Sequence, residues 1–210
     1  LILASMGLRP VILERGSDVK SRVRAVDNFY KTGILDTETN IQFGAGGAGT
    51  FSDGKLNTQV GGAYVKEVVN EFVKFGAPEE VGYLNKPHIG SDNLKNVVRN
   101  IRNEILSLGG KILFDTTLID LEIKNGKVVK ANYGNQSNTF DEIVLAVGHS
   151  ARDVYEMVNN RGIFIESKDF AVGLRIEHLK DDINLSQYGN KYAKLSCIYN
   201  TKTSLRWQLG

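Results

Sequence analysis

The sequence predicts an α/β protein with a parallel, doubly covered sheet that is interrupted by a small antiparallel meander. A helix-compatible segment at 1–6 precedes the apolar run at 11–13, which is typical of a buried parallel strand. After residue 108 the hydrophobic period changes from 3.6 to 2. The apolar segment 140–147 then leads through a glycine into a helical segment, the strand–helix order of α/β folds.

Composition excludes several classes of protein. Of the 210 residues, 41% are hydrophobic and 24% are charged, which is ordinary for a soluble globular protein. A net charge of +2 argues against a nucleic-acid binder. Cys197, the single cysteine, excludes an internal disulfide framework and suits a reducing compartment. With no apolar run of membrane-spanning length and no signal peptide, we expect a cytoplasmic protein without a membrane partner.

The segment 17–40 is polar and predicts a loop with a short helix around residues 25–30. Its bases Lys20, Arg22 and Arg24 are expected on a solvated face.

Two amphipathic helices are expected downstream, at 64–75 and 92–108. Ser91 or Asp92 is the predicted N-cap of the second helix, and a glycine follows each one. The apolar stripes, both predicted to face the core, comprise Val65, Val68, Val69, Phe72 and Val73 in the first helix and Leu94, Val97, Val98, Ile101, Ile105 and Leu108 in the second.

The meander is predicted over 111–133, with strands at 111–114, 118–124 and 127–133. Asn125-Gly126 is a strong signal for a two-residue type I′ hairpin turn. A turn at 134–138 and a strand at 140–147 should follow.

Near the C-terminus, alternation over 170–177 predicts a strand on which Arg175 and Glu177 form a surface ion pair. Strand-like pieces follow around 193–200.

A glycine-rich stretch, 42–56, contains Gly44, Gly46, Gly47, Gly49 and Gly54. Such a run makes a poor helix or strand, but its bare N–H groups can form a concavity for a phosphate. A flexible surface loop is the alternative. The flanking aromatics Phe43 and Phe51 favour a binding loop.

Glu14 closes the first predicted strand. A helix, a glycine, a buried strand and a terminal acid form the second half of a dinucleotide-binding βαβ unit, whose acid bonds a ribose hydroxyl. A solvated acid at a strand end is the alternative. Only 13 residues precede Glu14, so the first phosphate loop of such a unit is expected to lie upstream of Leu1.

The later strand–glycine–helix sequence places Gly148 and His149 where a ligand meets a helix N-terminus. His149 is either a catalytic base or a turn histidine.

The chain resembles the bacterial FAD-dependent dehydrogenases described as NAD(FAD)-utilising, within the glutathione-reductase-like flavoproteins. The stretches that carry the resemblance are 8–16, 40–56, 86–90, 145–153 and 170–178. It implies a Rossmann-like FAD-binding core with the three-stranded meander as an insertion, covering 1–160 with the helical segment 64–108. A partial α+β substrate domain covers 161–210.

The resemblance also implies a set of cofactor contacts. Glu14 would bond the adenosine ribose, and Leu118 would meet adenine through its backbone. The remaining FAD contacts implied are Arg15, Gly16, Gly44, Gly46, Gly47, Ala48, Gly49, Thr50, Ser52, Asp53, Lys55 and Gly148.

The sequence departs from the family pattern in three places. The first βα phosphate loop is missing, Ala45 stands where the family has Glu, and the chain stops before the late FAD-binding strand. We therefore expect an internal piece of a longer protein.

Two functions are open at this point. The first is an FAD-dependent oxidoreductase acting on an unknown small molecule, with NAD(P)H as a possible electron donor. His149 and Arg152 are its catalytic candidates by placement, and Lys86-Pro87-His88 is a candidate for substrate contact. No metal site is expected. The second is a non-catalytic remnant or interaction module unable to hold FAD.

Overall fold

The computed structural model describes residues 1–51, 56, 62–84, 88–167, 169, 172–174 and 176–191. They fall into two units that divide between Phe164 and Ile165; the boundary expected from the sequence lies at residue 160. Helices, a parallel strand pair and an antiparallel sheet are all present, so the mixed α/β class is confirmed.

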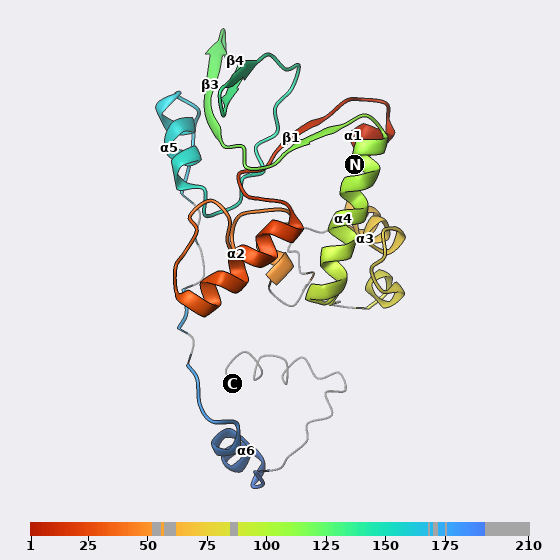
Figure 1. The fold of residues 1–210 in the computed structure, drawn as a ribbon, viewed down its shortest axis with the longest axis vertical. Coiled ribbons are helices and arrows are strands. Elements are labelled where there is room, and N and C mark those ends of the chain that lie inside the picture. The colour runs from red at the N-terminus through yellow and green to blue at the C-terminus, as the bar shows by residue number, and fades with distance from the viewer. Residues whose placement is uncertain are drawn as a thin grey trace. The chain divides into compact units, whose positions relative to one another are not determined.

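The parallel sheet joins β1 (Val11–Leu13), labelled in Figure 1, to β2 (Lys111–Leu113). Ile12 lies opposite Ile112 in this pairing. Helix α1 (Ile2–Ser5) precedes β1 as expected. The strand predicted at 111–114 therefore belongs to this sheet, and its assignment to the meander was wrong. In the part of the chain described, the sheet has these two strands. Ile12 is 37% exposed, so the sheet is not covered on both faces at this position, although the sequence had predicted it to be.

Helix α2 (Val19–Thr32) contains the short helix predicted around residues 25–30 and corrects the loop predicted at 19–24. The side chain of Asp18 caps it by accepting a hydrogen bond from Ser21 N at 2.9 Å, and Gly33 ends it in the left-handed conformation. Its buried positions are Val19, Arg22 and Val26. The full length of the helix was not predicted, because an arginine occupies its buried face.

The larger core cluster lies between α3 (Ala63–Lys74), the short 3-10 helix η2 (Glu79–Gly82) and α4 (Ser91–Ser107). Both predicted helices are thus confirmed. The predicted N-cap of the second was wrong, since α4 is preceded by Gly90 and has no side-chain cap bond. Most of the two stripes belongs to this cluster, namely Val69, Phe72, Val73, Leu94, Val97, Val98 and Ile101. Val68 and Leu108 are 48% and 38% exposed.

The meander consists of β3 (Leu118–Lys124), β4 (Lys127–Tyr133) and β5 (Gln136–Asn138), in that order. The hairpin turn at Asn125-Gly126 is confirmed, with both residues at positive φ. The third strand of the meander is β5, at residues 136–138, where the sequence had predicted a turn over 134–138. The polar residues 136–138 pair with 131–133, and a polar edge strand carries no apolar signal.

The strand expected at 140–147 is not formed, since residues 142–148 lie in no helix or strand. Val144 is 82% exposed, while Phe140 and Ile143 pack against the meander. An apolar run becomes a strand only when a neighbouring strand pairs with it. The helix expected next is confirmed as α5 (Arg152–Asn160), which packs against β3 (Figure 1).

The second unit contains α6 (Lys180–Tyr188), which the sequence did not predict. Within the expected strand 170–177, residues 172–174 and 176–177 are described and lie in no strand. The Arg175 ion pair and the strand-like pieces around 193–200 lie outside the described residues.

Candidate functional site

The candidate site is built where β1 ends, at the carboxylate of Glu14. Its Oε1 accepts hydrogen bonds from Gly16 N at 2.9 Å and from Gly44 N at 3.0 Å. The acid at the strand end and the start of the glycine-rich stretch are therefore in direct contact, although 30 residues separate Glu14 from Gly44.

The first glycines of the stretch are packed tightly against their neighbours. A Cβ on Gly16 would approach the Cα of Gly44 to 2.6 Å, and a Cβ on Gly44 would overlap Arg22. A Cβ on Gly46 would overlap the hydroxyl of Thr50. Gly47 has open space around it. A solvated linker therefore does not describe this part of the stretch, whereas Gly47 is exposed and unconfined.

Arg22 is the residue that the sequence interpretation placed wrongly. It is fully buried rather than on a solvated face. Its guanidinium donates to the carbonyls of Asn40 at 2.9 Å, Ile41 at 2.8 Å, Gly44 at 3.1 Å and Ala45 at 2.7 Å. Burial lowers the pKa of Arg22 to about 10, with the Glu14 charge opposing that shift, so the side chain stays charged at neutral pH.

Arg15 links the end of β1 to α5. Its guanidinium pairs with Asp153 and with Glu38, the latter at 3.2 Å, and lies 5.2 Å from the Phe43 ring centroid. The hydrogen bond from Arg15 lowers the pKa of the Asp153 carboxyl below its usual value. Arg15 therefore joins two elements in the structure and is not a free side chain waiting for a ligand.

A second link joins the glycine-rich stretch to the turn before α5. Ser150 Oγ lies 3.3 Å from Gln42 Oε1, and Phe43 packs against the cluster around Ala151. Leu118 belongs to the same cluster, at the start of β3. The ends of β1 and β2, the glycine-rich stretch and the N-terminus of α5 thus meet at one edge of the first unit.

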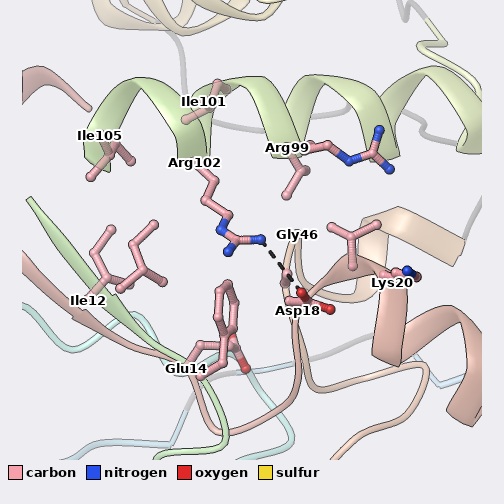
Figure 2. Close-up of a pocket in the computed structure, with 14 residues that line it drawn as sticks. Ile12, Glu14, Asp18, Lys20, Gly46, Arg99, Ile101, Arg102 and Ile105 are labelled. Carbon is pink, nitrogen blue, oxygen red and sulfur yellow. Dashed lines mark ion pairs between the residues drawn. The ribbon is translucent and has the colours of Figure 1, made fainter. Parts of the chain in front are cut away.

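A cavity of about 200 Å³ opens beside this edge, between the parallel sheet and α4 (Figure 2). Figure 2 shows Arg102 reaching from α4 toward Asp18, at 3.6 Å. Hydrogen bonding from Ser21 first, and then the Arg102 charge, keep the pKa of Asp18 below its usual value. The lining residues are Ile12, Glu14, Asp18, Val19, Lys20, Ala45, Gly46, Val98, Arg99, Ile101, Arg102, Ile105, Ile112 and Phe114.

The remaining predicted site residues are distributed around the edge. Ala48, Gly49 and Thr50 lie in the 3-10 helix η1 (Ala48–Phe51), where Thr50 is fully buried. Gly148, His149 and Arg152 are exposed. The Gly148 carbonyl accepts from Tyr155 Oη at 2.9 Å, and His149 Nδ1 lies 3.4 Å from Ser150 Oγ.

Some of the predicted contacts lie outside the described residues, namely Ser52, Asp53, Lys55, Lys86 and Pro87. His88 is described and exposed. Among the residues of the described ranges, no group of three or more His, Cys, Asp or Glu side chains is placed to hold a metal ion.

The sequence carried a signal for the residue that was missed. Asp18 precedes Ser21 at capping distance, and Val19, Val23 and Val26 recur at helical spacing. A helix drawn through them places Arg22 beside Val19 and Val26. A long cation inside an apolar stripe is a sign that the side chain has buried partners.

Comparison with known proteins gives one informative result. No family model matches the chain. An uncharacterized protein of Clostridium beijerinckii is 45% identical over 192 residues, which are 91% of this chain and 36% of that protein. The chain thus spans about a third of the length of the relative that it matches. None of the helices in the described ranges combines the length and apolar composition needed to cross a bilayer.

Proposed function

We propose that this chain is the FAD-binding portion of a flavin-dependent oxidoreductase with a Rossmann-like core. The observation that carries the proposal is the contact between the Glu14 carboxylate and Gly44 N at 3.0 Å. In dinucleotide sites a strand-terminal acid and a glycine-rich turn hold the sugar and the phosphates together. Here a strand-terminal acid meets a second glycine-rich stretch, distinct from the first phosphate loop of such a unit, at the end of a parallel strand.

The described residues fit the sugar-and-phosphate end of such a cofactor. Glu14 uses Oε1 for the two glycine N–H groups, which leaves Oε2 as the acceptor for a ribose hydroxyl. Gly47 offers exposed main chain with open space around its Cα. Bound FAD supplies hydride transfer through its isoalloxazine ring. NAD(P)H is the proposed electron donor, and the cytoplasm the proposed location.

His149 and Arg152 are proposed catalytic candidates by placement. They lie in and after the turn that contacts Gln42 through Ser150, at the edge where Glu14 ends its strand. In this proposal, an ionisable side chain from this turn contacts a small-molecule substrate beside the cofactor and transfers a proton.

A second candidate is favoured by the size of the cavity. A volume of about 200 Å³ is below the range of roughly 300–1,000 Å³ that is usual for sites of drug-sized ligands. This alternative proposes that residues 1–210 alone are a non-catalytic module unable to hold FAD.

The test compares the full-length protein with the isolated chain. We expect full-length protein to purify with the absorption of an oxidised flavin, which NADH or NADPH then bleaches. Colourless full-length protein that does not take up FAD would contradict the flavoenzyme proposal. Titrating the 210-residue chain with FAD tests the alternative, which saturable quenching of flavin fluorescence at micromolar FAD would exclude.

Glu14→Gln locates the site within the protein. The amide oxygen still accepts from Gly16 and Gly44, while the charge opposite the ribose is lost, so the Kd for FAD should rise at least tenfold. Glu67→Gln on α3 removes an exposed charge and is the matched control. If both variants bind FAD as tightly as the wild type does, Glu14 does not contact the cofactor.

A further inference from the structure

Four peptide carbonyls around Arg22 turn toward its guanidinium. In a trans peptide the C=O of one residue and the N–H of the next point in opposite directions, and the described chain has no cis peptide. The guanidinium accepts no bonds and donates to the carbonyls of Asn40, Ile41, Gly44 and Ala45. The N–H groups that follow these four carbonyls therefore point away from Arg22.

Two of those four N–H groups are already bonded. Gln42 N donates to the side chain of Asn40 at 2.8 Å, and Ala45 N donates to Ser17 O at 3.0 Å. The N–H of Gly46 has no hydrogen-bond partner among the residues that the structure describes. Gly46 is exposed and lines the cavity, so its N–H lies beside the space that an anion would enter.

Gly44 is held from both sides. Its N–H donates to Glu14 and its carbonyl accepts from Arg22 at 3.1 Å. The ring of Phe51, at the end of η1, lies 4.8 Å from the same guanidinium. One buried cation thus joins α2, residues 40–45 and η1. An ordinary glycine-rich run is costly to order, and these contacts offset part of that cost.

We propose that Arg22 is a positioning residue that fixes residues 40–46 in the binding conformation before an anionic nucleotide arrives. This inference rests on the proposed function, because it names the residue that prepares the phosphate-facing main chain of that site. If the loop is ordered beforehand, the fraction of protein competent to bind is close to one, and removing Arg22 reduces that fraction.

The test uses Arg22→Met and Arg22→Lys in the full-length protein. Methionine keeps most of the packing volume without donors, and lysine keeps the charge without the planar fork that reaches several carbonyls. Arg24→Met, an exposed arginine of the same helix, is the matched control.

The first readout is amide hydrogen exchange of a peptide covering 40–51, without FAD. We expect exchange at least tenfold faster in Arg22→Met, with Arg22→Lys intermediate and Arg24→Met like the wild type. Peptides from α4 should keep their protection in every variant. Unchanged exchange of 40–51 in Arg22→Met would overturn the proposal. If Arg22→Met does not fold, unchanged exchange of 40–51 in Arg22→Lys would overturn the proposal instead.

The second readout is the kinetics of FAD binding. A loop that is less often in the competent state should lower the association rate at least tenfold and leave the dissociation rate nearly unchanged. Wild-type association kinetics in a folded variant with faster exchange would overturn the proposal. If the wild type binds no FAD, the proposed function fails, while the exchange experiment still decides whether Arg22 orders the loop.

Discussion

At the residue scale, two glycines of the 42–56 stretch are required for different structural reasons. Gly44 has a φ of 122° and no room for a Cβ beside Arg22, whereas Gly47 has a φ of 65° and open surroundings. The sequence alone places both in one glycine-rich run and does not distinguish them. Packing against Arg22 separates them.

Substitution by alanine should show this difference. Gly47→Ala should cost about 1–2 kcal/mol, the price of a left-handed residue with a Cβ. Gly44→Ala adds an overlap with a buried side chain and should cost roughly 3–4 kcal/mol in total. Urea unfolding of the two variants measures the difference. Equal losses would show that Arg22 does not pack against Gly44.

The N-cap of α2 gives a pH-dependent prediction. The pKa of Asp18 is lowered in the fold, so its charge stabilises the protein above the unfolded pKa of about 3.9 and that stabilisation is lost as the pH falls through the lowered value. Asp18→Ala should cost about 1 kcal/mol at neutral pH, and the difference from wild type should narrow below about pH 4.

Asp27→Ala is the control for that experiment, since Asp27 is exposed inside the same helix. Unfolding free energies measured from pH 3 to 7 are the data required. A loss for Asp18→Ala that is the same at every pH would exclude the charge as its cause.

At the element scale, α3 and α4 followed directly from their apolar period, whereas only a short part of α2 was predicted. The stripe of α2 contains Arg22, whose four carbonyl partners lie 18 to 23 residues further along the chain. No local pattern contains that information. The strands show the same limit: 118–124 and 127–133 were predictable from the Asn125-Gly126 turn, while pairing of β2 with β1 brings residues 100 positions apart into register.

Packing of α4 offers a prediction at this scale. Val97 is fully buried in the cluster with α3 and η2, whereas Val68 on α3 is 48% exposed. Val97→Ala should cost about 2 kcal/mol through lost burial and the remaining cavity. Val68→Ala should change stability by less than about 0.5 kcal/mol. Thermal and urea unfolding measure both, and comparable losses would contradict the packing described.

At the scale of the whole molecule, the chain divides between Phe164 and Ile165. Phe164 and Leu174 are 84% and 89% exposed and lie outside any helix or strand. Exposed chain of this kind is where proteases cut first, because cleavage requires no local unfolding.

Limited chymotrypsin treatment should therefore cut after Phe164 or Leu174 before it cuts after Tyr30 or Tyr64, with the sites identified by mass spectrometry. Tyr30 and Tyr64 are similarly exposed, at 69% and 79%, but lie in α2 and α3. First cleavage after either tyrosine would contradict the division.

The sequence by itself determined the α/β class, the amphipathic helices and the hairpin, because each depends on local periodicity or on one turn. It also singled out Glu14 and the glycine-rich stretch. Only the tertiary structure decided that they touch, that Arg15 is engaged by Asp153 and that Arg22 is buried. Those facts depend on contacts between segments that are far apart in the sequence. The environment of such a side chain is set by residues that are not its neighbours in the sequence.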